Sequence, residues 1–259
     1  MLLHLSDLHF GTERFECMQA IQRFCAKYQP EVVVVSGDLT QRAKFKEFYH
    51  CKRFLESLNI PYFVVPGNHD IPLYHLWNRT FRPFTLYQLF FGSLEKTFMT
   101  EHFYLIGLNS IRRRFHTKGH ISVEQIQKVD QQLIDAPLNK FKIIVSHQPF
   151  YTAKENHHLN DCPTLAKFAL KEWGQHNLYA LLHGHLHFVA VYDLNREFEL
   201  NLEHPIYEVH AGTATSQRLH KKMLNSFNVL CKDGTFQHYF FDEQRQEFLL
   251  RAAEQDESH

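Results

Sequence analysis

The chain has 259 residues, of which 44% are hydrophobic, which is enough for one large α/β domain or two small ones. Its 28 basic and 28 acidic residues cancel, so no overall field would gather nucleic acid or an anionic membrane surface. Nucleic acid is therefore not an expected partner, and any phosphate must be recognised locally.

The cysteines and the N-terminus indicate the compartment. Five widely spaced cysteines without a C-x-x-C pair argue against a disulfide framework or a thiolate metal site. The start, MLLHLSDLHFG, lacks the basic and apolar regions of an export signal, and no apolar run reaches the roughly 18 residues of a membrane span. We therefore expect a cytoplasmic protein without a transmembrane segment.

Three short apolar runs in the first part of the chain each end in a polar turn and are predicted to be buried strands. They cover Leu2–Leu5, Val32–Val35 and Tyr62–Val65. Helical patterns fill the intervals, at about residues 16–28 and 41–58. Strands that alternate with helices predict right-handed, parallel βαβ units.

The middle of the chain continues this alternation. Strands are expected at Phe103–Leu108 and Lys142–Val145. Between them a helix begins after Ser122, where Gln125 completes a capping box, and ends before Pro137.

The last part of the chain has a different pattern. A helix at about residues 163–174 leads to a strand at Leu178–Leu182. Four further segments look rich in strand without helices between them, which favours antiparallel pairing: 187–193, 206–210, 226–231 and 235–241. The chain is thus predicted to be an α/β (α+β) protein in which two mixed β-sheets pack as a sandwich with helices on both outer faces. A single domain is expected over residues 1–250, followed by a disordered polar tail at 251–259.

Histidines and acidic residues cluster directly after the predicted strands, where open α/β sheets place their ligand sites. Asp7 and His9 are two residues apart, and in an extended backbone this spacing points both side chains the same way. His185 and His187 have the same spacing, and Gly184 before them permits a close approach. Each pair is a candidate for binding one metal ion.

Three other turns add candidate donors. An isolated carboxylate, Asp38, can bridge two cations with its two oxygens. In the run GNHD, Asn68 offers a carbonyl oxygen to a metal, while His69 is expected to face the substrate and Asp70 to orient that imidazole. His147, after another predicted strand, completes the set.

The motifs D-x-H, G-D, G-N-H-D, H-x-P and G-H-x-H, in this order between residues 7 and 187, resemble those of the calcineurin-like metallophosphoesterase family. Within it, LSDLH, SGDLT, VPGNHD and GHLH are most similar to the bacterial class III cyclic-nucleotide phosphodiesterases. The resemblance implies the metallophosphoesterase fold, a double β-sandwich flanked by helices, with two metal ions. It places one ion on Asp7, His9, Asp38 and His187, and the other on Asp38, Asn68, His147 and His185. One departure is Gln148, where many relatives have a second histidine before the proline.

The resemblance also implies a mechanism. Two cations about 3.5–4 Å apart would bridge a water, lower its pKa and direct the resulting hydroxide at phosphorus. His69 would lie nearest the leaving group and protonate it as a general acid. Nitrogen and oxygen ligands without thiolate suit manganese, iron or zinc.

Hydrolysis of a small phosphodiester, such as a cyclic nucleotide, is the predicted function. The alternative enzyme is a pyrophosphatase for a UDP-linked lipid precursor, which the aromatic stretch Leu73–Phe91 motivates. From another class, a non-catalytic scaffold with the same fold should have lost metal ligands, whereas all seven are present here.

The aromatic stretch has two interpretations. It is either a helical hairpin, broken at Pro83, that packs on its own domain or on a second copy in a homodimer, or an apolar lid over the substrate. The lid would use Trp77 and Phe84 to hold a base or an acyl chain. A second phosphate would be bound by one of Arg112, Arg113 and Arg114.

Two other histidines lack the context of a ligand. His183 precedes Gly184 and is expected to be a core residue or a donor behind the ligands, and His210 a packed residue.

Overall fold

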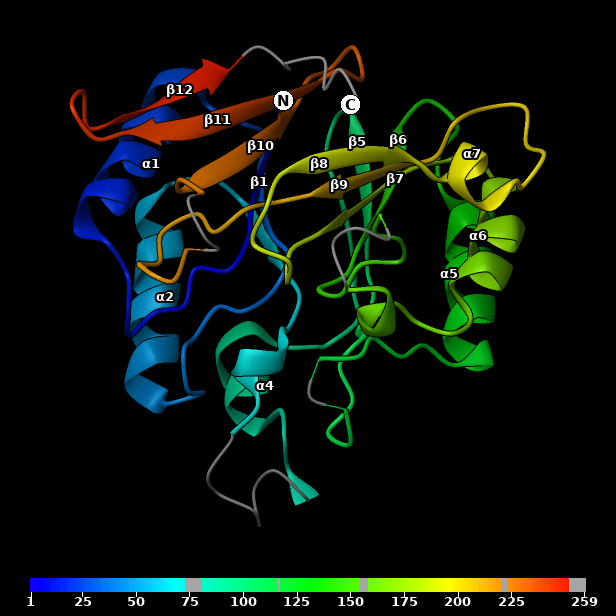
Figure 1. Cartoon of the computed structure of the whole chain (residues 1–259), viewed down its shortest axis with the longest axis horizontal. Coiled ribbons are helices and arrows are strands. Elements are labelled where there is room, and N and C mark those ends of the chain that lie inside the picture. Colours follow the sequence, from blue (N-terminus) through cyan, green and yellow to red (C-terminus); the bar gives the residue numbers. More distant parts are fainter. Residues whose placement is uncertain (73–80, 116, 154–157, 220–222, 252–259) are drawn as a thin grey trace.

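The computed structural model describes residues 1–72, 81–115, 117–153, 158–219 and 223–251. These residues form two six-stranded sheets that pack face to face, with helices on the outer side of each (Figure 1). The predicted sandwich architecture is therefore confirmed. In the described part of the chain, no helix combines the length and the apolar character needed to cross a membrane.

The first sheet has the strand order β12-β11-β10-β1-β2-β3. Its parallel half consists of β1 (Leu2–Leu5), β2 (Val32–Val35) and β3 (Tyr62–Val64), connected through α1 (Phe15–Tyr28) and α2 (Phe45–Ser57). An antiparallel meander extends the sheet beyond β1 with β10 (Ser226–Leu230), β11 (Phe236–Asp242) and β12 (Glu247–Arg251).

The second sheet has the order β4-β5-β6-β7-β9-β8. Its four central strands are parallel: β5 (Phe103–Gly107), β6 (Phe141–Val145), β7 (Leu178–His183) and β9 (Tyr207–His210). Antiparallel strands β4 (Thr97–Met99) and β8 (Ala190–Asp193) form its edges. Its outer helices are α5 (Val123–Asp135) and α6 (Ala166–Gly174).

Strand residues alternate between two apolar layers. In β2, Val33 and Val35 pack against α1 and α2 in one cluster, whereas Val32 and Val34 belong to the layer between the sheets. That inner layer also takes residues from the second sheet, so it holds the sandwich together. A third cluster joins the second sheet to α5 and α6.

Some boundaries differ from the predictions. Helix α2 begins at Phe45 instead of about 41, because Ala43 has φ 52° and the Glu47 carboxylate accepts the backbone N–H groups of Arg42 and Lys44. A short helix, α7 (Leu194–Phe198), lies where none was expected.

Two expectations for the last part of the chain were wrong. Strand β9 pairs with β7 in parallel, although β8 to β9 and β10 to β12 are antiparallel as expected. Arg251, assigned to the disordered tail, instead pairs with His238 at the end of β12. The rest of the predicted tail lies outside the described residues.

Candidate metal centre

The seven predicted metal ligands lie at one end of the sandwich, each in the turn that follows a parallel strand. Three of these turns follow β1, β2 and β3 in the first sheet, and two follow β6 and β7 in the second. Hydrogen bonds join the two groups of turns: His185 N–H donates to Asp7 Oδ2 over 3.1 Å, and His147 Nδ1 lies 2.9 Å from the Ser36 carbonyl. The packing of the two sheets therefore assembles the cluster.

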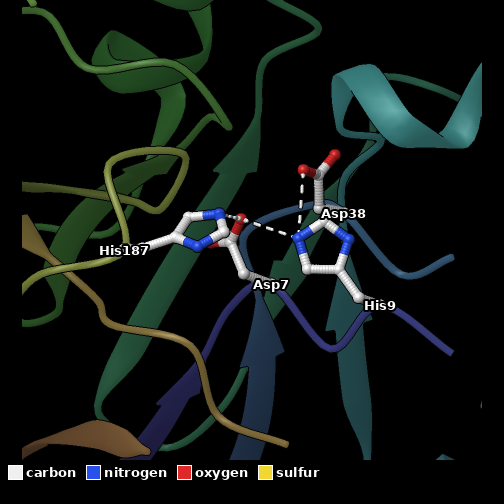
Figure 2. A group of neighbouring side chains, drawn as sticks. All are labelled: Asp7, His9, Asp38 and His187. Carbon is white, nitrogen blue, oxygen red and sulfur yellow. Dashed lines mark ion pairs between the residues drawn. The ribbon is translucent and has the colours of Figure 1, made fainter. Parts of the chain in front are cut away.

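One half of the cluster contains Asp7, His9, Asp38 and His187, whose side chains point toward one another in Figure 2. His187 Nε2 lies 3.0 Å from Asp7 Oδ1. His9 Nε2 lies 3.7 Å from the same oxygen and 3.6 Å from Asp38 Oδ2. All four donor atoms fall within 4.8 Å of one another, so one cation can reach them together.

The other half is organised around Asn68. Its Oδ1 lies 2.9 Å from His147 Nε2 and 3.1 Å from His185 Nδ1. Asp38 Oδ1 is 3.4 Å from His147 Nε2, whereas its Oδ2 faces His9 in the first half. The Asp38 carboxylate thus presents one oxygen to each half, an arrangement that allows it to bridge two cations.

Unpaired buried atoms indicate that cations fit these positions. Neither ring nitrogen of His9 has a hydrogen-bond partner among the described residues, although the side chain is inaccessible to solvent. The Nδ1 atoms of His147 and His187 face the backbone carbonyls of Ser36 and Arg218, which leaves each Nε2 turned toward a carboxylate. Backbone carbonyls orient metal-binding imidazoles in this way.

The protonation states suit the same role. Burial lowers the pKa of His9 to about 4, which favours the neutral imidazole that binds metals. Burial opposes ionisation of Asp7, but the neighbouring His187 outweighs it and holds the pKa of Asp7 well below its usual value. In turn, although burial works against it, Asp7 raises the pKa of His187 to about 9. A cation at this position would replace the proton that Asp7 favours on His187, because a metal binds the neutral imidazole.

The backbone at the ligands was predicted incorrectly. The D-x-H and H-x-H pairs were expected in extended backbone, whereas five of the seven ligands have positive φ angles: Asp7 (51°), His9 (47°), Asp38 (51°), His185 (68°) and His187 (60°). Left-handed conformations cost non-glycine residues free energy, and they concentrate at functional sites. Asp7 and His9 do converge, but through a tight turn instead of strand alternation. His185 and His187, which were expected to share one ion, separate instead: His185 faces Asn68 in one half and His187 faces Asp7 in the other.

Glycines adjoining the ligands allow these turns to touch. An added Cβ at Gly184 would overlap Ser6 Oγ and Asp7 Oδ2. At Gly67, it would overlap the backbone nitrogen and Oδ1 of Asp38. Gly67 has φ −108°, which alanine adopts without backbone strain, so an alanine there would be destabilised only by steric overlap.

Gly67→Ala is therefore expected to displace Asp38, to lower stability by about 1–3 kcal/mol and to weaken metal binding at both halves. Thermal melts and metal titrations measure the two effects. Gly92→Ala is a control, because its φ of 77° strains the backbone while, apart from its two chain neighbours, no described residue lies within 4 Å of the added Cβ. Unchanged metal affinity in Gly67→Ala would contradict the tight contact.

His69 and Asp70 have different surroundings from those expected. The Asp70 carboxylate accepts hydrogen bonds from the backbone N–H groups of Leu39, Thr40 and Gly67, which joins two motif turns. Burial and the nearby Asp38 raise the pKa of Asp70 to about 7. It is not Asp70 that orients the His69 imidazole, since His69 Nδ1 lies 3.0 Å from the Gln41 carbonyl.

The predicted substrate residues differ in their surroundings. The Arg112 guanidinium donates to the carbonyls of Asn109 and Ile111 and to Gln125 Oε1, so it braces its own loop against α5. Arg113 and Arg114 are exposed, and their role stays a prediction. Phe84 is half-buried at the start of α4 (Thr85–Phe91), and Trp77 lies outside the described residues.

Helix α4 supports the interpretation of the aromatic stretch as part of its own domain. Tyr87 is fully buried and donates its hydroxyl hydrogen to the Val64 carbonyl over 3.0 Å. Phe90 packs against Phe45 and Phe48 of α2, with ring centroids 5.0 and 5.9 Å away. The proposed homodimer stays a prediction.

Two neighbours of the centre were missed. Asp161 Oδ2 lies 3.5 Å from His185 Nε2, on the side of the ring opposite Asn68. Arg218 offers its carbonyl to His187 Nδ1 and its guanidinium to the Gln41 side chain. Asp161 belongs to no motif, and a backbone carbonyl leaves no trace in a sequence, so neither had a signal.

Comparisons with known proteins agree with this geometry. The sequence profile of the family described as Calcineurin-like phosphoesterase matches residues 1–189. A protein of Arcobacter nitrofigilis named "Probable glycerophosphodiester phosphodiesterase" is 26% identical over 207 residues, which cover 78% of this chain and 72% of the relative. The 3',5'-cyclic adenosine monophosphate phosphodiesterase of Escherichia coli K12 is 21% identical over 215 residues, with 77% of this chain and 71% of the relative covered.

Solved structures share the fold at lower sequence identity. A purple acid phosphatase from yellow lupin superposes with a TM-score of 0.70 and 11% identity over 96% of this chain, which spans only 52% of that protein. A dimetal phosphatase of Danio rerio gives 0.59 with 12% identity, over 93% of this chain and 92% of that one.

Proposed function

Because the chain belongs to the calcineurin-like phosphoesterase family of metal-dependent hydrolases of phosphoester bonds, we propose that its substrate is a small phosphodiester. The position of Asp38, with one oxygen toward each half of the ligand cluster, carries this proposal, because it fits a centre for two cations. The two relatives named as a glycerophosphodiester and a cyclic-nucleotide phosphodiesterase indicate the substrate class.

The seven ligands would divide as the sequence motifs suggest. Asp7, His9 and His187 would hold one ion, Asn68, His147 and His185 the other, and Asp38 would bind both. When bound, the two ions would supply charge neutralisation for the phosphoryl oxygens and acidify the attacking water. The donor set suits manganese, iron or zinc.

We assign to His69 the role of general acid, which gives a proton to the leaving group. It is only partly buried, and its ring stands edge-on to His9 with centroids 4.8 Å apart. A carbonyl only accepts hydrogen bonds, so the contact with Gln41 requires that Nδ1 carry a hydrogen. Nε2 is then the atom that transfers a proton to the departing oxygen, and the Nδ1–H tautomer remains.

A panel of phosphoesters on metal-loaded protein tests the proposal. It contains a cyclic nucleotide, a glycerophosphodiester, an aryl phosphodiester, a phosphomonoester and a UDP-linked lipid. The highest kcat/KM is expected for a small diester. A higher value for the monoester would refute the proposed class.

The UDP-linked lipid is included for a specific reason. A UDP-2,3-diacylglucosamine pyrophosphatase of Chlamydia muridarum is 34% identical over 76 residues, although these cover only 28% of this chain and 23% of the relative. Preference for the lipid would make pyrophosphate hydrolysis the function, whereas loss of activity on every ester would favour the scaffold.

Phe84→Ala tests whether the aromatic segment contacts the substrate. If Phe84 belongs to a lid, the variant should raise KM for the natural substrate about tenfold, or ~1.4 kcal/mol, and leave a small aryl diester nearly unaffected. Steady-state kinetics on both substrates and a thermal melt give the answer. Leu89→Ala, at an exposed position of α4, is the matched control. Equal losses on both substrates with a lowered melting temperature would assign Phe84 to the core.

A further inference from the structure

Three buried side chains lie behind the ligand turns and have no place in the proposed reaction. His183 ends β7, and Glu208 and His210 lie on the neighbouring strand β9, where His183 pairs with His210. All three are inaccessible to solvent. A carboxylate at such depth is costly unless its oxygens are used, so its contacts indicate what it does.

One oxygen of Glu208 joins the two turns that bear ligands in the second sheet. Glu208 Oε1 accepts the Phe150 backbone N–H over 2.6 Å and lies 2.9 Å from His183 Nε2. Phe150 follows His147 by three residues, and His183 precedes His185 by two. The turns also touch directly, because Gly184 N–H donates to the His147 carbonyl over 3.2 Å. A single Glu208 oxygen thus connects the segments that carry His147 and His185.

The same three side chains also resemble a metal site, since their donor atoms lie within 4.8 Å of one another. The ring positions argue against it. The centroids of His183 and His210 are 3.9 Å apart at 67°, whereas the ring pairs His9–His187 and His147–His185 of the centre are 5.4 and 5.1 Å apart. Imidazoles that converge on one ion, each with nitrogen about 2 Å from it, need the wider spacing. His183 and His210 pack edge to face instead.

We propose that Glu208 is a positioning residue for the half of the metal centre that contains Asn68, His147 and His185. This inference rests on the proposed two-metal function. Without the carboxylate, the Phe150 N–H would be buried and unpaired and His183 Nε2 would lose the neighbouring oxygen, so both turns would relax. Partners of this kind, one step removed from the metal, typically alter affinity about 10–100-fold. The larger loss should fall on the ion of that half, because Glu208 contacts none of Asp7, His9 and His187 in the described residues. His187 shares its turn with His185, but Asp7 and the Arg218 carbonyl hold its ring independently.

Two variants separate positioning from bulk stability. Glu208→Leu fills similar space without an acceptor, and Glu208→Gln keeps an oxygen that can accept from Phe150. Manganese titration by calorimetry of the metal-free full chain, with ion counts by mass spectrometry, should show two sites in the wild type. In Glu208→Leu one site should lose affinity about 10–100-fold while the other stays within threefold, and Glu208→Gln should recover most of the loss. Amide hydrogen exchange of metal-free protein should be faster at Phe150 in Glu208→Leu.

Glu31 offers a matched control. Its carboxylate likewise accepts a backbone N–H, from His102 over 3.2 Å, and lies 2.8 Å from His102 Nδ1, but at the opposite end of β2 from the ligands. Glu31→Leu should leave both manganese affinities unchanged. Two unaltered affinities in Glu208→Leu, a parallel loss at both sites, or a third ion in the wild type that Glu208→Leu removes would each overturn the positioning role. A wild-type chain that binds no metal would overturn the two-metal function and this inference together.

Discussion

Asp38→Ala is expected to abolish hydrolysis and to reduce the bound metal from two ions per chain toward none. The carboxylate faces His9 with one oxygen and His147 with the other, so its removal takes a ligand and a negative charge from both halves at once. It also frees the His69 backbone N–H, which donates to Asp38 Oδ1 over 2.8 Å. A loss of activity of at least about 10³-fold is expected, because the acidity of the attacking water depends on both ions.

Metal analysis after dialysis, together with activity on an aryl diester, measures this effect. Asp130→Ala is a suitable control, because Asp130 contacts His176 Nε2 at 3.3 Å in a partly exposed ion pair outside the cluster. If Asp38→Ala still held two ions per chain, Asp38 would not be the bridging ligand.

Much of the fold was predictable, because buried strands and amphipathic helices leave recognisable patterns of apolar residues in the sequence. The strands β1, β2, β6 and β7 are short, largely apolar and buried runs, and such runs indicate core strands when turn residues bound them. Helix α7 was missed although Asp193 caps it, because five residues are too few to show helical periodicity. The parallel pairing of β9 with β7 depends on contacts between distant segments, which no local pattern records.

The candidate site, like the fold, was predictable only in part. Donor residues after parallel strands must meet at one edge, so the membership of the cluster could be read from the motifs. The left-handed backbone conformations of Asp7 and His185 could not be predicted from the motifs, because they depend on how the two sheets pack against each other. The hydrogen bonds by which Arg112 stabilises its own loop could not be predicted either, since the sequence around it shows only a run of arginines. The cytoplasmic location likewise stays a prediction.

His69→Ala is expected to keep both metal ions and to slow the reaction in proportion to how poor the leaving group is. The alanine retains the backbone N–H that donates to Asp38 Oδ1, so the bridging carboxylate keeps its support. What is lost is the imidazole that the Gln41 carbonyl holds through Nδ1. General acid catalysis contributes about 10²–10⁴-fold when an alkoxide must leave, and far less for an activated aryl oxide, which departs without a proton.

The measurement is kcat/KM for wild type and His69→Ala over a series of phosphodiesters whose leaving-group alcohols span a wide range of pKa. A plot of log(kcat/KM) against that pKa should be steeper for the variant, because leaving-group charge is no longer neutralised in the transition state. Metal counts on the same preparations exclude an indirect effect through the centre. A deficit of equal size for alkyl and aryl esters would remove the general-acid role and leave His69 as a residue that only binds the phosphate.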